Sequence, residues 1–176
     1  PETLATIPEK DRRWAWLEID LNAIRHNASA VKKMIGSGRH MMAVVKADAY
    51  GHGAVRVAKT ALNSGADYLG VATVDEGIKL REGLVNAPIL MLAEPPASAI
   101  PLLLAYKIMP AVYSPEFAIK YAEAADSMGL CAPYHLAINT GMNRIGVRWD
   151  EVVNFMHQIG FHRALELEGV FTHFAT

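Results

Sequence analysis

Apolar and polar positions follow one another along the chain in a regular order, as short apolar runs alternate with longer amphipathic stretches. The apolar runs predict buried strands. These strands are expected at 41–47, 68–72, 88–92, 109–112, 134–138 and 167–171. Helical periodicity between them predicts helices at 52–64, 74–82, 97–106, 115–128 and 150–160. Glycine ends helices well, and it stands at the predicted helix ends at 65, 83, 129 and 160.

The N-terminal residues show a different pattern. Residues 1–13 are polar and turn-rich, so a loose segment is expected there. Residues 14–21 alternate as a strand does. Asp20 or Asn22 then caps a predicted helix that ends at Gly36. The main domain is therefore predicted to occupy residues 22–176.

Regular alternation of strands and helices predicts an α/β fold with parallel strands joined by right-handed crossovers. The continuously apolar run at 88–92 indicates a sheet covered on both faces. A doubly wound sheet and a (β/α)8 TIM-type barrel both fit, although no Gly-x-Gly-x-x-Gly fingerprint follows the first strand. A complete barrel takes about 250 residues. If the fold is a barrel, the chain therefore forms an incomplete barrel with roughly the first six strand–helix units.

Composition excludes several classes of protein. Hydrophobic residues make up 52% and charged residues 20% of the 176 positions, which is typical of a globular domain. The net charge is −1 without a basic stripe, so no nucleic-acid partner is expected. Glu94, Lys107 and several prolines interrupt the longest apolar stretch, so no membrane span is expected. The single cysteine, Cys131, indicates a reducing, cytoplasmic compartment and is expected to be a packing residue.

Lys46 is the main candidate for chemistry. It ends an apolar run and precedes, by four positions, Tyr50 and a glycine-flanked turn. Burial at a strand end disfavours the charged form of a lysine, and a neutral amine can form a Schiff base with an aldehyde. A lysine can equally extend from a strand end into solvent. The local pattern leaves both interpretations open.

Three sequence blocks, of which the first contains Lys46, decide between these two interpretations. Val-Lys-Ala-Asp-Ala-Tyr-Gly-His-Gly at 45–53 resembles the pyridoxal-phosphate attachment motif of alanine racemases. Asn-Thr-Gly-Met-Asn-Arg-Ile-Gly at 139–146 and Gly-Val-Phe-Thr-His-Phe-Ala-Thr at 169–176 match further family blocks in the same order. Residues 16–21 and 24–27 resemble the family's N-terminal strand and first helix. The resemblance runs from about Trp14 to the last residue.

The resemblance implies a barrel, pyridoxal 5'-phosphate as cofactor, and no metal. It assigns Lys46 to the Schiff base and to proton transfer on one face of the substrate, and Tyr50 to the cofactor phosphate. It places Arg144 near the phenolic oxygen of the cofactor and the substrate, and His173 against the cofactor ring. Within the same blocks Asp48 and His52 are expected to fix the turn, and Met142 to pack beside the site.

The chain departs from the family pattern in the block around Arg144. Ala137 stands where many members carry a carbamylated lysine that braces this arginine. Asn139 replaces a common aspartate, and Asn143 a common glycine. We hypothesise that water or a small anion such as chloride fills the space at Ala137, held by Arg144 and Asn139. The departures also resemble branches with serine or broader specificity.

The resemblance implies the N-terminal half of an enzyme that interconverts L- and D-alanine, supplying D-alanine for peptidoglycan. In the family a C-terminal β domain follows, which the strand at 14–21 joins and which this chain lacks. Family members are homodimers in which a tyrosine from the partner's C-terminal domain is the second base. This chain alone is therefore expected to be inactive. The alternatives are a serine or broad-specificity racemase, and a non-catalytic pyridoxal-phosphate-binding or interaction domain.

Overall fold

The computed structural model describes residues 17–176, and its strands form one parallel sheet. The strands are β1 (Met42–Val44), β2 (Tyr68–Val71), β3 (Ile89–Met91), β4 (Ile108–Val112), β5 (Ala132–Asn139), β6 (Val147–Arg148) and β7 (Leu165–Thr172). The helices are α2 (Leu21–Ile35), α3 (Lys46–Tyr50), α4 (Ala54–Leu62), α5 (Val74–Glu82), η2 (Ala97–Ala99), α6 (Ile100–Ala105), α7 (Pro115–Ser127) and α8 (Val152–Ile159). This order confirms the predicted alternation.

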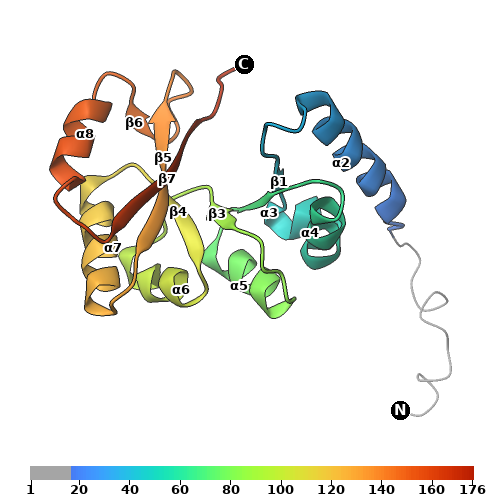
Figure 1. The fold of residues 1–176 in the computed structure, drawn as a ribbon, viewed down its shortest axis with the longest axis horizontal. Coiled ribbons are helices and arrows are strands. Elements are labelled where there is room, and N and C mark those ends of the chain that lie inside the picture. The colour runs from blue at the N-terminus through green and yellow to red at the C-terminus, as the bar shows by residue number, and fades with distance from the viewer. Residues whose placement is uncertain (1–16) are drawn as a thin grey trace, which may run out of the picture.

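The sheet is an open barrel. Its strands are hydrogen-bonded in the order β1-β2-β3-β4-β5, and β7 pairs with β5 beyond them. Figure 1 shows α2 and α4 beside β1 at one end of this row, and α7 and α8 near β5 at the other. Within residues 17–176, β1 pairs with β2 alone and β7 with β5 alone. The predicted incomplete barrel is therefore confirmed.

Helix α2 begins and ends where the sequence indicates. The Asp20 carboxylate accepts hydrogen bonds from the backbone N–H groups of Asn22 and Ala23, at 2.7 and 3.3 Å, which caps the helix. Gly36 follows its last residue with φ +81°. Leu21, predicted to end a strand, instead begins α2, and residues 17–20 are in neither helix nor strand. Residues 1–16 of the predicted loose segment and strand lie outside the described residues.

The hydrophobic core lies between the sheet and its helices. The largest fully buried side chains are those of Tyr121, Tyr134, Leu69, Leu80 and Ile89. The end strands are less covered, since Val44 in β1 is 39% exposed and Val170 in β7 is 54% exposed. Exposed apolar side chains are expected at the unpaired edges of an open sheet. No helix within residues 17–176 is long and apolar enough to cross a membrane.

Asp67 joins α2 to the start of β2. Its carboxylate accepts hydrogen bonds from the Lys32 ammonium and the Met41 N–H, both at 2.8 Å. These two bonds hold the pKa of the Asp67 carboxyl well below its usual range. The unfolded chain therefore binds a proton more readily than the folded chain, and the contribution of Asp67 to stability is present above the unfolded pKa.

We expect this contribution to decline progressively as the pH falls from about 4, near the unfolded pKa of an aspartate, towards the lower pKa of the folded carboxyl. Urea unfolding should show a loss of unfolding free energy between about pH 5 and pH 3 in the wild type. This loss should be smaller in Asp67→Asn. Asp126→Asn, which changes an exposed carboxylate on α7, is the control and should follow the wild type. An equal loss of unfolding free energy over this pH range in all three proteins would contradict the prediction.

Candidate functional site

The chain turns left-handed directly after Lys46. The four residues from Ala47 to Tyr50 have φ angles of 51°, 53°, 54° and 55°, although none of them is glycine. Each such L-residue costs about 1–2 kcal/mol in this conformation. The predicted continuation of β1 through Ala47 is therefore wrong, because the strand ends at Val44 and residues 46–50 form the short turn α3.

Asp48 and His52 hold this turn to the helix that follows. The Asp48 carboxylate accepts hydrogen bonds from the Ala54 N–H at 3.0 Å and the Lys79 ammonium at 2.8 Å. Both bonds lower the pKa of the Asp48 carboxyl. The Nδ1 atom of His52 lies 3.0 Å from the carbonyl oxygen of Ala49. Both side chains thus have the turn-fixing contacts that the sequence predicted.

Lys46 and Tyr50 stand at the two ends of the same turn. The Lys46 side chain is half-buried, and Tyr50 is 61% exposed. Within residues 17–176, neither the Lys46 ammonium nor the Tyr50 hydroxyl has a hydrogen-bond partner. A cation and a phenol held on a strained turn without partners can both bind an anionic ligand.

Arg144 and His173 lie at a second, small cavity. Arg144 belongs to the loop after β5, and His173 follows the last residue of β7. Together with Ala137, they line a cavity of about 10 Å³. The hydroxyls of Thr140 and Thr172 lie 2.6 Å apart and join the two segments. Within the described part of the chain, the side chains of Arg144 and His173 make no hydrogen bond or ion pair.

Asn139 and Asn143 shape the Arg144 loop. The Asn139 side-chain oxygen accepts hydrogen bonds from the N–H groups of Gly141 and Asn143, at 3.0 and 3.1 Å. Its amide nitrogen donates to the Asn143 side-chain oxygen at 2.9 Å. Asn143 has φ +58°, a conformation that favours glycine and that asparagine tolerates better than other residues. This explains how asparagine fits at a position where the resemblance led us to expect glycine.

The space beside Ala137 is small. Ala137 is 2% exposed, and a cavity of about 10 Å³ has room for about one water molecule. Because the Asn139 side chain is engaged in the loop, Arg144 is the charged group that faces this cavity. The hypothesis of a water or small anion there stays a prediction.

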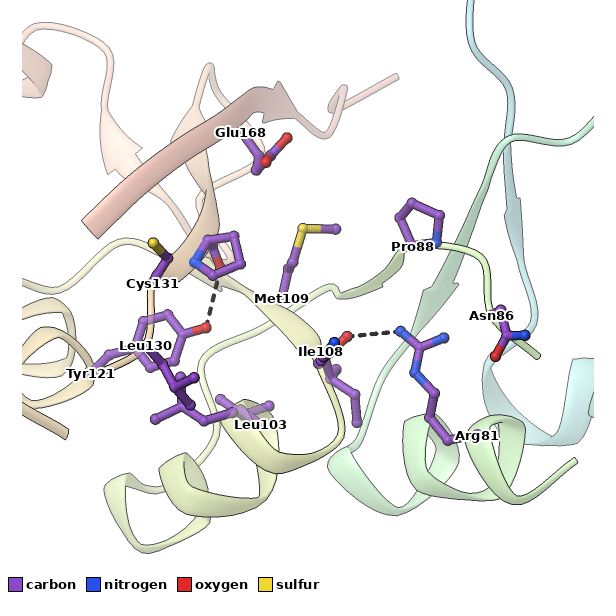
Figure 2. Close-up of a pocket in the computed structure, with 13 residues that line it drawn as sticks. Arg81, Asn86, Pro88, Leu103, Ile108, Met109, Tyr121, Leu130, Cys131 and Glu168 are labelled. Carbon is purple, nitrogen blue, oxygen red and sulfur yellow. Dashed lines mark hydrogen bonds between the residues drawn. The ribbon is translucent and has the colours of Figure 1, made fainter. Parts of the chain in front are cut away.

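A larger cavity of about 430 Å³ lies at the amino ends of the strands, opposite the ends that Lys46 and Arg144 follow (Figure 2). Arg81 lines it and donates four hydrogen bonds to backbone carbonyl oxygens. The Tyr121 hydroxyl donates to the carbonyl oxygen of Pro133 at 3.2 Å. The Arg81 guanidinium and the Tyr121 hydroxyl are therefore already hydrogen-bonded within the protein and stabilise the fold. Cys131 also lines this cavity and is exposed, so the prediction of a packing residue is wrong.

The predicted site residues all follow the carboxyl ends of parallel strands. Lys46 and Tyr50 follow β1, Arg144 follows β5, and His173 follows β7. The pair that follows β1 lies near one end of the row of strands, and the pair that follows β5 and β7 lies near the other. All four residues lie on the side of the sheet where the strands have their carboxyl ends. Enzymes built on parallel barrels carry their chemistry at this edge. The fold and these residues define a barrel-type domain with an amine and three further polar side chains beyond the carboxyl ends of its strands.

Comparison with known proteins agrees with this class. The family model described as alanine racemase, N-terminal domain, matches residues 19–176, and the chain belongs to this family. The chain is 42% identical to alanine racemase of Synechocystis over 94% of its length and 45% of the relative. It is 45% identical to alanine racemase 1 of Bacillus subtilis, over 93% and 42% of the two chains.

Solved structures give the same result. Alanine racemase of Clostridium difficile superposes with a TM-score of 0.88 at 41% identity, covering 97% of this chain and 46% of that one. A histidine racemase of Leuconostoc mesenteroides superposes with a TM-score of 0.85 at 29% identity, over 97% and 45% of the two chains. The chain thus spans less than half the length of these relatives.

Sequence reasoning missed two residues at this edge, Glu76 and Lys79 in α5. Glu76 accepts a hydrogen bond from the Ala47 N–H, and Lys79 donates to Asp48. The pattern Thr-x-x-Glu at 73–76 is a capping box and could have indicated a helix start. It gives no sign that the glutamate also reaches the Lys46 turn.

Proposed function

We propose that this chain is the pyridoxal-phosphate-binding portion of an alanine racemase, which interconverts L- and D-alanine. The observation that carries the proposal is the position of Lys46. Its amine has no partner within residues 17–176, and it begins a strained turn at the carboxyl edge of a parallel barrel. Membership of the alanine racemase N-terminal domain family supports the same reading.

The side chains at the edge fit pyridoxal phosphate. The cofactor carries an aldehyde, a phosphate and a phenolic oxygen, which call for an amine and hydrogen-bond or cationic donors. Lys46 offers the amine, Tyr50 a phenol, Arg144 a guanidinium and His173 an imidazole. None of these four side-chain groups has a hydrogen-bond partner among residues 17–176, since the contact that His52 makes with Tyr50 is to its backbone carbonyl oxygen. The donor set is therefore available to the cofactor.

Each residue then has a definite task. When bound, pyridoxal phosphate supplies an electron sink that makes the α-proton of the amino acid acidic. The Lys46 amine would hold the cofactor through its aldehyde and would take or return the α-proton on one face of the substrate. The Tyr50 hydroxyl would donate a hydrogen bond to a phosphate oxygen. The Arg144 guanidinium would attract the anionic oxygens of cofactor and substrate, and His173 would orient the ring beside it.

Racemisation also needs proton exchange on the opposite face of the substrate. The proposal places that second base outside this chain, in the C-terminal domain of a partner subunit in a homodimer. The chain alone is then inactive. A role in supplying D-alanine for peptidoglycan and a cytoplasmic location belong to the same proposal, and the relatives named alanine racemase come from bacteria.

Borohydride trapping tests the proposal in protein expressed from the complete reading frame. Wild-type protein mixed with pyridoxal phosphate and reduced should carry the cofactor mass on the peptide containing Lys46. Lys46→Arg keeps the positive charge and should carry none. The wild type should also interconvert L- and D-alanine faster than L- and D-serine. Faster interconversion of L- and D-serine would show that serine, and not alanine, is the preferred substrate. Trapping without any racemisation would favour a non-catalytic cofactor-binding domain, and no trapping would contradict the proposal.

A further inference from the structure

Glu76, in the first turn of α5, uses its two carboxylate oxygens for different contacts. Its Oε2 atom accepts hydrogen bonds from the N–H groups of Ala72 at 2.7 Å and Thr73 at 3.3 Å. The Thr73 hydroxyl in turn accepts from the Glu76 N–H at 3.3 Å, which completes a capping box. Oε2 alone therefore satisfies the side-chain part of the cap.

The other oxygen, Oε1, leaves the helix and reaches the Lys46 turn. It accepts a hydrogen bond from the Ala47 N–H at 2.7 Å. That N–H belongs to the peptide group that links Lys46 to Ala47. Fixing this peptide plane fixes the direction in which the Lys46 side chain leaves the backbone. Because Oε2 is bound at the end of β2, the carboxylate ties the lysine to the neighbouring strand.

The turn needs support from outside because its own residues do not favour it. Four consecutive L-residues with positive φ persist only where surrounding groups hold them. Lys79, one turn further along α5, supplies a second contact by donating to Asp48 at 2.8 Å. The Lys79 and Asp48 side chains are 58% and 47% exposed. Exposed ion pairs contribute little. The Glu76 hydrogen bond is also exposed, but it is charge-assisted and acts directly on the peptide group between Lys46 and Ala47.

We propose that Glu76 is a positioning residue for Lys46: its Oε1 atom holds the 46–47 peptide in the orientation that aims the lysine amine at the cofactor. The inference rests on the proposed function and assigns Glu76 no contact with cofactor or substrate. It separates two roles of one side chain, helix capping through Oε2 and lysine orientation through Oε1.

Two variants separate these roles. Glu76→Gln keeps one oxygen for the capping box, which also accepts glutamine, but has no second acceptor. Thr73→Ala breaks the capping box and leaves the Ala47 contact in place. Both are made in protein from the complete reading frame. The first measurement is amide hydrogen exchange over residues 46–53 in cofactor-free protein. The second is the dissociation constant for pyridoxal phosphate, read from its visible absorption.

In Glu76→Gln we expect exchange at Ala47 to be faster by about tenfold and the cofactor to bind about tenfold more weakly, since a backbone N–H loses its acceptor. Thr73→Ala should lower the melting temperature yet keep both quantities within about twofold of wild type. The inference would be overturned if Glu76→Gln had the wild-type exchange rate and cofactor affinity, or if both variants changed these quantities equally. Either result would leave the proposed function intact. A wild-type protein that binds no cofactor would contradict the proposed function, and the inference would fall with it.

Discussion

Lys46→Ala, in protein from the complete reading frame, is expected to lower the rate of alanine racemisation by a factor of about 10²–10⁴ or more, the range that one positioned acid–base group contributes. Under the proposed function, the variant loses the amine that would hold the cofactor and would exchange the α-proton on one face. No other lysine belongs to the turn that follows β1. Chiral chromatography of L- and D-alanine after timed incubation measures the effect.

Lys59→Ala is the matched control, because it removes an exposed lysine from the nearby helix α4. Its rate should equal that of the wild type. Exchange of the α-hydrogen for deuterium from solvent gives a second readout that does not depend on complete racemisation. If Lys46→Ala kept more than about a tenth of the wild-type rate, a role in general acid–base catalysis would be contradicted.

Gly146→Ala is expected to lower the free energy of unfolding by about 2–6 kcal/mol, the combined range for a strained backbone and an overpacked site. Gly146 has φ +105°, a conformation that L side chains rarely adopt. An added Cβ would lie 2.7 Å from the Asn139 nitrogen and 2.8 Å from the Ile138 carbonyl carbon. Both are backbone atoms of β5, so relief of the clash requires movement of the Arg144 loop.

Gly141→Ala is the control for this variant within the same loop. Gly141 has φ +131°, but an added Cβ would meet no atom within 4 Å. It therefore carries the backbone strain without the clash, and it should cost less than Gly146→Ala. Urea unfolding of both variants measures the difference. Equal unfolding free energies would show that the close approach of Gly146 to β5 is not a constraint.

Much of the fold could be predicted because its hydrophobic pattern is regular. The apolar run at 88–92 contains β3, and Asp20 caps α2 as its position indicated. The two-residue strand β6 was missed because it is too short to show a period. The end of β1 was misplaced because the residues from Ala47 to Tyr50 carry no glycine to signal a left-handed turn.

The positions of the predicted site residues at strand ends could be predicted from the sequence, but the contacts that support them could not. The motif around Lys46 and the block around Arg144 place their residues at strand ends, and the parallel sheet brings those ends to one edge. The contact between Glu76 and Ala47 joins residues 29 positions apart. No local pattern encodes such a contact, since it depends on how α5 packs beside the β1 end.

Cys131 offers a practical use. It is the single thiol among these 176 residues, it is exposed, and it lies just before β5, at the end of the sheet opposite Lys46. A maleimide fluorophore attached there would lie away from the strand ends that Lys46 and Tyr50 follow. Under the proposed function, energy transfer between that dye and pyridoxal phosphate would report loading of the domain in real time.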